Sequence, residues 1–189
     1  MGKVSWRPGT MIYPLPAVLV TCGDKPENWN MITVAWTGTI CSDPAMCYIS
    51  VRPERHSFPL LKETMEFTIN LTTTEMVRAT DWAGVRSGRD YDKWKETGLT
   101  PVAGEKVKSP TILESPLSIE CRVKEILDLG SHSMFISDVI NVRADEKFLD
   151  SATGKFKLEE ASLLAYSHGG YFELGQLLGT FGFSVKKNK

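Results

Sequence analysis

The chain has 189 residues, of which 42% are hydrophobic and 24% are charged, and its formal net charge is −1. This length suits a single domain over 1–189, which can bury about 70% of the unfolded surface. A chain so close to neutral has no electrostatic reason to bind nucleic acid or an acidic membrane, so neither is expected as a partner, and the ligand should be a small molecule or a protein.

The cysteine spacing contains neither a C-x-x-C motif nor a zinc-binding pattern, so no metal site is expected. We expect mainly buried thiols and no disulfide among the four cysteines, which are Cys22, Cys41, Cys47 and Cys121. The N-terminus lacks the apolar segment of a signal peptide, and no run reaches 18 apolar residues. The sequence therefore predicts a cytoplasmic protein.

The first predicted elements follow an irregular arm over 1–16. They are a short strand over 17–22 and a strand over 31–40 that continues through a turn at Asp43-Pro44 into a buried strand over 46–51. Alternation in the 31–40 strand separates a bulky face from a small, hydroxylated one: Ile32, Val34, Trp36 and Ile40 against Thr33, Ala35, Thr37 and Thr39. The last two strands are predicted to form a hairpin.

Polar residues at the start of the next predicted helix form the clearest candidate ligand site. Ser57 stands at the N-cap position and Pro59 lies in the first turn. Backbone N–H groups at a helix start favour an anion, and a guanidinium adds a bidentate phosphate contact. The sequence thus predicts a phosphate site made of Arg52, Arg55, His56 and Ser57. An ordinary capped surface helix with solvated arginines is the alternative.

A strand over 66–71 is predicted next, and it is followed by a second helix. Thr72 and Glu75 have the spacing of a capping box, which predicts that this helix runs over 75–83. From residue 99 to residue 116 the chain has three prolines and little periodicity. This stretch is therefore predicted to be a loop.

Two long strands are predicted in the second half of the chain. The first faces inward with Leu117, Ile119, Cys121 and Val123 and exposes Ser118, Glu120, Arg122 and Lys124 to water. The second, over 134–142, presents one apolar face made of Met134, Ile136, Ile140 and Val142, which Asp138 interrupts. Antiparallel strands with few helices predict a mainly β fold, a closed or partly closed β-barrel with peripheral helices.

The adjacent glycines Gly169 and Gly170 permit close backbone approach to a ligand or to another subunit, and a second glycine-containing segment lies earlier in the chain. A glycine-led loop over 87–92 runs into a short helix near Lys93, which by default would be an exposed lysine. Near the C-terminus, Gly169-Gly170 stands between aromatic residues, after a short helix predicted over 159–164.

Conventional catalytic motifs are missing from the sequence: it has no G-x-S-x-G, H-E-x-x-H, P-loop or G-x-G-x-x-G. A predicted phosphate site and aromatic residues without an acid/base set indicate that a cofactor carries the chemistry.

A longer pattern makes a family recognisable. Asn30-x-x-Thr33-x-x-Trp36 is followed by Asp43-Pro44, then by Ser50-Val51-Arg52-Pro53-x-Arg55-x-Ser57 and Phe67-x-x-Asn70. The order continues through residues 87–94, 130–132 and 171–175, and so covers nearly the whole chain. This pattern resembles the flavin reductase-like family, and within it the flavoredoxin branch.

The resemblance implies an FMN-binding split barrel that forms a homodimer with the flavin near the subunit interface. It also implies which residues border the flavin ring and its chain and which hold the phosphate. The residues expected to bind the cofactor are Asn30, Met31, Thr33, Trp36, Ser50, Val51, Arg52, Arg55, His56, Ser57 and Lys93.

His132 is the expected catalytic residue, because it matches a glycine-acidic-histidine turn that the family uses near nicotinamide. Ser131 replaces the acidic residue of that turn, which weakens the inference, and a plain turn histidine is the alternative. For Trp36, a core aromatic is the alternative. Strict alternation also places Thr33 and Trp36 on opposite faces of one strand, so both can reach one flavin only if the strand bends.

Two functional classes follow from the resemblance. As an enzyme, the protein would transfer hydride from NADH or NADPH to FMN and pass electrons to free flavin or another acceptor. As an electron carrier, it would hold FMN tightly and exchange electrons with a redox protein partner. A flavin-binding barrel without redox turnover is a third possibility.

Overall fold

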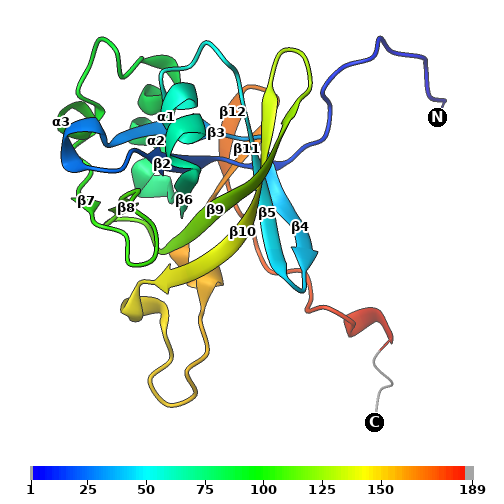
Figure 1. Ribbon diagram of the computed structural model, residues 1–189. Helices are drawn as coiled ribbons and strands as arrows, with labels where there is room; N and C mark the ends of the chain where they lie inside the picture. Colours follow the sequence, from blue (N-terminus) through cyan, green and yellow to red (C-terminus); the bar gives the residue numbers. More distant parts are fainter. Residues whose placement is uncertain (1, 186–189) are drawn as a thin grey trace.

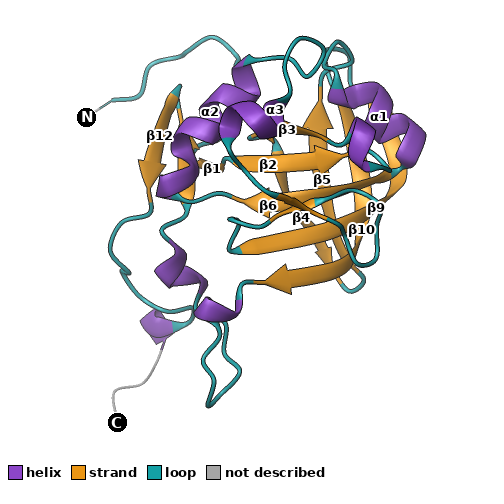
Figure 2. Cartoon of the chain, turned by 90° about the vertical axis from the view of Figure 1, so that its left-hand side faces the viewer, coloured by secondary structure: helices purple, strands orange, loops and turns teal. Residues whose placement is uncertain are grey.

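A computed structural model describes residues 2–185, whose centre is a seven-stranded antiparallel sheet curved into a barrel (Figures 1 and 2). The strand order is β3-β2-β6-β9-β10-β5-β4. The strands of this sheet are β2 (Val18–Cys22), β3 (Asn30–Val34), β4 (Thr37–Ser42), β5 (Ala45–Val51), β6 (Glu66–Leu71), β9 (Leu117–Asp128) and β10 (Ser133–Ala144). The mainly β fold predicted from the sequence is confirmed.

Smaller elements surround the barrel. A three-stranded sheet contains β1 (Leu15–Pro16), β11 (Leu164–Ser167) and β12 (Gly170–Glu173), and a two-stranded one contains β7 (Pro101–Val102) and β8 (Thr111–Ile112). The α-helices are α1 (Ser57–Thr64), α2 (Val77–Val85) and α3 (Lys93–Thr97). Short 3-10 turns occupy Pro26–Asn28, Thr74–Met76, Glu146–Phe148, Leu158–Ala161 and Phe183–Val185.

Two clusters of apolar side chains hold these layers together. The larger fills the barrel, where Phe67 and Phe135 are fully buried and Leu61 of α1 joins them. The smaller lies under α2 and includes Leu19 and Met31 from the strands. Both faces of β2 are therefore buried, one by the barrel interior and one by helices.

The predicted strand over 31–40 is in fact two strands, which corrects the alternation assigned to it. The chain leaves β3 after Val34, and β4 begins at Thr37 on the opposite edge of the sheet. The amide of Ser50 donates to the carbonyl of Trp36 (2.9 Å), which ties the break to β5. The hairpin predicted at 43–44 is confirmed by the pairing of β4 with β5.

The solvated face predicted for the 117–123 strand is wrong at Ser118 and Glu120, which are both buried. The Glu120 carboxylate accepts the amides of Glu105 (2.8 Å) and Lys106 (2.7 Å). The chain between β7 and β8 therefore covers this part of β9. A pattern of alternation cannot reveal such a cover, because the loop comes from elsewhere in the sequence.

The apolar face predicted for β10 is not the buried face of that strand. Ser133, Phe135 and Ser137 are the buried residues, so the apolar series that begins at Met134 lies on the other face. Serines occupy the interior positions on either side of Phe135, so the buried face of β10 cannot be recognised from the spacing of apolar residues. Asp138 is half-buried, and its Oδ1 lies 3.6 Å from Lys124 Nζ.

The predicted helix caps differ from those in the structure. Ser57 is the first residue of α1 rather than its cap, and His56 at the cap position makes no side-chain cap bond. The Thr72 hydroxyl donates to the carbonyl of Ala17 and therefore does not cap the second helix. That helix begins with a 3-10 turn, which α2 follows. The helix predicted over 159–164 is a 3-10 turn followed by β11.

The cysteines are free thiols, and Cys22, Cys47 and Cys121 are buried as predicted, while Cys41 is half-buried. That the whole of 1–189 forms one domain stays a prediction.

Candidate functional site

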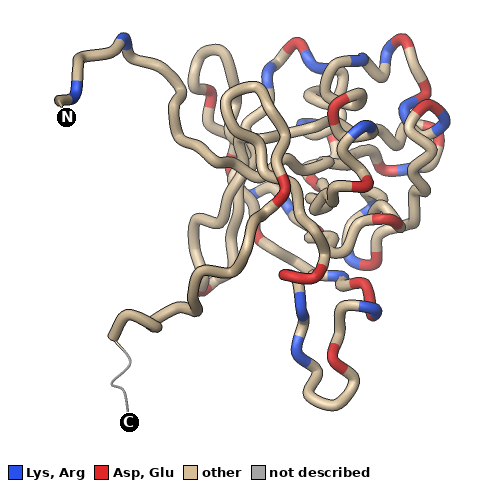
Figure 3. The backbone as a smooth tube through the Cα atoms, turned by 180° about the vertical axis from the view of Figure 1, so that it is seen from behind, with Lys and Arg blue, Asp and Glu red and all other residues tan. Residues whose placement is uncertain are grey.

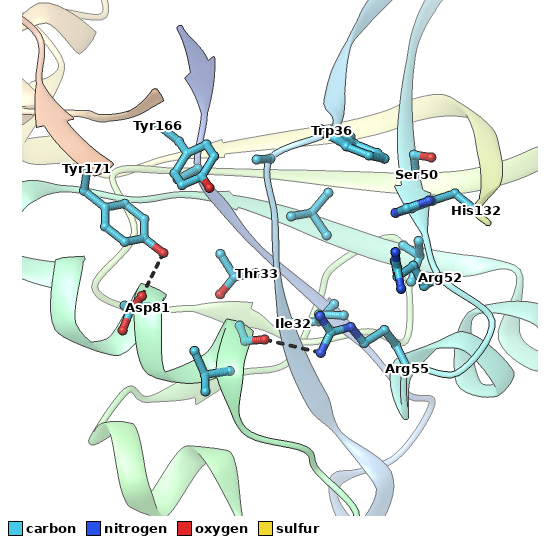
Figure 4. Close-up of a pocket in the computed structure, with 16 residues that line it drawn as sticks. Ile32, Thr33, Trp36, Ser50, Arg52, Arg55, Asp81, His132, Tyr166 and Tyr171 are labelled. Carbon is cyan, nitrogen blue, oxygen red and sulfur yellow. Dashed lines mark hydrogen bonds between the residues drawn. The ribbon is translucent and has the colours of Figure 1, made fainter. Parts of the chain in front are cut away.

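A cleft of about 440 Å³ opens beside the break between β3 and β4 (Figure 4). Its walls come from β3, β5, α2, the turn between β9 and β10, and the small sheet. The residues predicted for the site that line it are Thr33, Trp36, Ser50, Val51, Arg52, Arg55 and His132. Residues as far apart in the sequence as Thr33 and His132 thus meet in one cleft.

The strand break explains how Thr33 and Trp36 line the same cleft. The Thr33 hydroxyl donates to the carbonyl of Thr80, so it holds β3 against α2. Trp36 lies in the two-residue link beyond β3, where the chain no longer follows the strand pleat, and its side chain is partly exposed. The prediction that Thr33 and Trp36 lie on opposite faces assumed an unbroken strand, so it does not apply here.

Trp36 packs against His132 at the mouth of the cleft. The ring centroids are 4.4 Å apart with the planes tilted by 41°. Ser131 Oγ and His132 Nδ1 form a hydrogen bond of 2.9 Å. Partial burial, followed by the positive charge of Arg52, lowers the pKa of His132, so the imidazole is neutral at pH 7.

A second cavity of about 150 Å³ adjoins the cleft, because Ile32, Arg55 and Gly84 line both. Three of the four residues predicted for the phosphate site meet in this second cavity, namely Arg55, His56 and Ser57, and Lys93 lies there as well. The fourth, Arg52, lines only the cleft, which corrects its assignment. The loop after α2 closes it with residues that were not predicted, namely Arg86, Ser87, Gly88 and Arg89. Cationic side chains thus outnumber the one carboxylate in the lining, that of Glu54.

Close packing holds this cavity in shape. Asn30 Nδ2 donates to Ser57 Oγ (2.8 Å), which joins β3 to the start of α1. A Cβ at Gly88 would lie 2.5 Å from Asn30 Oδ1 and 2.8 Å from His56 Cδ2. Only glycine therefore fits at this position without displacing its neighbours. Burial, followed by the charges of Arg89 and Lys93, lowers the pKa of His56.

Lys93 is buried, with 5% of its surface exposed, which corrects the expectation of an exposed lysine. Its Nζ donates to the carbonyls of Met31 (3.0 Å) and Ala83 (2.6 Å) and so links β3 to α2. An ammonium group has three donors, which leaves one for a ligand. Burial, followed by repulsion from Arg55, lowers the pKa of Lys93 to about 8.

Met31 does not contribute its side chain to either cavity. The side chain is fully buried in the cluster under α2, and only the backbone carbonyl approaches the site, through Lys93. Asn30 likewise acts through Ser57 rather than as part of the cleft lining.

The far end of the cleft contains residues that sequence reasoning did not assign. Tyr171 Oη donates to Asp81 Oδ1 (3.2 Å), and the Tyr166 ring lies beside Tyr171 at a centroid distance of 5.7 Å (Figure 4). Burial and the Asp81 carboxylate raise the pKa of Tyr171 to about 12. The only signal in the sequence was the aromatic segment around Gly169-Gly170, which forms the β11–β12 hairpin.

Two kinds of feature are absent from residues 2–185. They hold no group of three or more histidine, cysteine, aspartate or glutamate side chains that could bind a metal ion. None of their helices is long and apolar enough to cross a membrane.

Comparison with known proteins agrees with this architecture. A family model described as a flavin reductase like domain matches residues 10–175. The solved structure of the flavoredoxin of Desulfovibrio vulgaris (Miyazaki F) is 30% identical, covers 98% of this chain and 100% of that chain, and has a TM-score of 0.89. A putative flavin reductase with a split barrel domain from Shewanella frigidimarina NCIMB 400 is 22% identical, with a TM-score of 0.78 over 88% of this chain and 85% of that one.

Among curated relatives, an NADH-dependent FMN reductase of Streptomyces nodosus subsp. asukaensis is 25% identical over 175 residues, which make up 92% of this chain and 85% of the relative. The split-barrel fold and the resemblance to flavoredoxins are thereby confirmed. The match to the family model spans most of the sequence, so the chain belongs to the flavin reductase-like family.

Proposed function

We propose that this protein is an FMN-dependent oxidoreductase that takes hydride from NADH or NADPH. The observation that carries the proposal is the joined pair of cavities, one a cleft with aromatic walls and the other small and cationic, which share Arg55. FMN has the same two parts, a flat ring and a phosphate. The lining therefore fits this cofactor in both shape and charge.

In this proposal each end of the site has its own residues. Arg55, His56, Ser57 and Lys93 would hold the phosphate, and Asn30 keeps the Ser57 hydroxyl in place. Thr33, Trp36 and the backbone at 50–52 would border the ring and its chain, because they line the cleft.

The flavin, when bound, supplies the hydride-accepting chemistry. The protein then has to orient the donor and exclude water. His132 is the residue we assign to donor positioning, because it is neutral and stands at the mouth of the cleft against Trp36. A neutral imidazole can contact a nicotinamide ring without repelling its positive charge after hydride transfer.

An electron carrier is the second candidate function. The packing of His132 on Trp36 favours it, because a nucleotide can stack over the ring only if this aromatic pair opens. The flavoredoxin similarity and Ser131, which stands where the family turn is acidic, favour it as well. The partner would then be a redox protein, whereas the enzyme would pass electrons to free flavin or another small acceptor.

Anaerobic mixing of the FMN-loaded protein with NADH or NADPH separates the two functions. For the enzyme, the oxidised flavin absorbance should bleach within seconds, and His132→Ala should slow this step. His168→Ala is the matched control, because that histidine packs on Tyr13 and lies outside the cleft lining. If neither nucleotide at millimolar concentration bleaches the flavin within minutes while dithionite does, the protein is a carrier.

Two properties accompany the proposed function. The protein acts as a homodimer, which the family resemblance and the open cleft near the small sheet support. It works in the cytoplasm, since four free thiols suit a reducing compartment.

A further inference from the structure

A third cavity, of about 460 Å³, is not used by the proposed function. It shares no residue with the cleft, but it adjoins the small cationic cavity, because both are lined by His56, Gly88, Arg89 and Lys93. Its other walls come from the chain before β3, the loop after α2 and the start of α3. Lys93 therefore stands at the junction of two cavities.

The two cavities differ in charge. In the third cavity the carboxylates of Glu27, Asp90 and Asp92 outnumber the cationic groups, whereas the small cavity has one carboxylate among several cations. Aromatic rings also line the third cavity, and Trp94 Nε1 donates to the carbonyl of Trp29 (2.9 Å), which holds the Trp94 indole in place. An anion is thus directed into the small cavity, and an uncharged apolar group fits the third.

The side-chain amine of Lys93 is held as a nucleophile would need to be. Its Nζ donates to the carbonyls of Met31 (3.0 Å) and Ala83 (2.6 Å). A neutral amine has two N–H groups, so both carbonyls keep their donors after the ammonium loses a proton, and the lone pair takes the position of the third donor. Burial, followed by repulsion from Arg55, lowers the pKa of Lys93 to about 8, which populates the neutral amine just above neutral pH.

From this placement we infer that Lys93 is a modification site for small acyl phosphates, which are mixed anhydrides of a carboxylic acid and phosphate. The phosphate lies in the small cavity with Arg55 and Arg89, and the acyl group lies in the third cavity. One bridging oxygen separates the phosphorus from the carbonyl carbon, so this carbon comes to the junction, beside Lys93. The inference rests on the phosphate site of the proposed function and adds a way in which that site is regulated.

The reaction is a transfer of the acyl group to nitrogen. Nζ forms an amide bond to the carbonyl carbon, and the bond from this carbon to the bridging oxygen breaks. The phosphate leaves with the electron pair of that bond and takes up the proton that the amine releases, so no further reactant is needed. Cationic side chains around the small cavity stabilise the departing phosphate. Acylated Lys93 has no charge with which to bind the phosphate of FMN, so acylation keeps the chain free of flavin.

Acetyl phosphate and the flavin-free, full-length protein test the inference, with peptide mass spectrometry as the readout. Lysine and arginine residues are spread over the helical side of the molecule (Figure 3), so the protein itself provides competing amines. The matched control is Lys95, an exposed lysine of the same helix that lies outside both cavities. At about pH 8, acetyl phosphate should acetylate Lys93 at least about tenfold faster than Lys95, because the bound phosphate brings the carbonyl carbon to Nζ.

Acetic anhydride is the second control, because it contains no phosphate and should acetylate the exposed Lys95 faster than Lys93. Inorganic phosphate should slow the reaction of Lys93 with acetyl phosphate and leave that of Lys95 unchanged. The same ratio of Lys93 to Lys95 acetylation with both reagents would overturn the inference.

Flavin titration of the acetylated protein gives the last measurement. The capacity for FMN should fall in proportion to the fraction of acetylated Lys93, while the capacity for riboflavin stays the same. A protein that binds FMN but shows no preference for Lys93 would overturn the inference and keep the cofactor assignment. Phosphate-sensitive acetylation of Lys93 in a protein that binds no flavin would do the reverse.

Discussion

Arg55 is the residue on which the two ends of the proposed flavin site depend. It lines both cavities, and its Nη1 lies 3.4 Å from the carbonyl of Gly84, at the long limit of a hydrogen bond. A contact this weak leaves the guanidinium available for a phosphate. The helix start beside it provides the backbone donors that complete such a contact.

Arg55→Ala should therefore weaken FMN binding while riboflavin binding stays the same. A charge-assisted contact is worth about 1.5–3 kcal/mol, so the dissociation constant for FMN should rise roughly 10- to 150-fold. Flavin fluorescence titration measures both ligands. Arg78→Ala is the control, because Arg78 is an exposed residue of α2 outside both cavities. Equal losses for FMN and riboflavin would remove the phosphate assignment.

Lys93 makes the pH dependence of FMN binding predictable. Its pKa of about 8 in the free protein means that the ammonium loses its proton just above neutral pH. FMN affinity should be constant from pH 6.5 to 7.5 and fall above pH 8, by at most about tenfold per pH unit. Lys93→Gln should bind more weakly at all pH values and show no such fall. A slope that survives this substitution would show that another group titrates.

The same pKa has the opposite consequence for folding. Because the unfolded lysine titrates near pH 10.4, the unfolded chain binds more protons than the folded one between about pH 8 and 10.4. The contribution of Lys93 to the stability of the flavin-free protein therefore rises with pH in this window, while its contribution to phosphate binding falls.

Among the elements, β9 shows how a loop can be fixed by one side chain. Glu120 is fully buried on the face that the loop covers, and its two oxygens accept the amides of Glu105 and Lys106. Asn70 of β6 acts similarly nearby, since its Oδ1 accepts the amide of Ile112 (3.0 Å) and the hydroxyl of Ser118 (2.7 Å). The loop is thus fastened to the barrel by side chains rather than by strand pairing.

Glu120→Gln should destabilise the protein by about 1–3 kcal/mol, because the amide group can accept only one of the two loop N–H groups. Urea unfolding measures the loss, and hydrogen exchange at residues 105 and 106 should become faster. Glu125→Gln on the exposed end of β9 is the control and should change neither. Since the loop does not line the cleft, FMN affinity should be unchanged; a large change would link the loop to the site.

For the whole molecule, barrel closure determines where the site can form. The two edge strands β3 and β4 are consecutive in sequence, so the two residues between them have to cross from one edge to the other. This crossing turns Trp36 into the cleft and brings its carbonyl to β5.

The sequence by itself determined the mainly β fold, the 43–44 hairpin and the grouping of Arg55, His56 and Ser57 at a helix start. Each of these depends on neighbours within a few residues, through turn chemistry, alternation and helix ends. The family pattern added Thr33, Trp36, Lys93 and His132, because motif order can be read without knowing the geometry.

Only the tertiary structure decided the break after Val34, the burial of Glu120 and Lys93 and the contribution of Tyr171 and Asp81 to the cleft. In each case the partner lies far away in the sequence. The chain after Val34 crosses to the opposite edge of the barrel, and Glu120 is covered by a loop. Lys93 donates to carbonyls of two other elements, and Tyr171 belongs to a separate sheet. Local periodicity cannot encode such partners, because a charged side chain reads as exposed until the groups that satisfy it are in place.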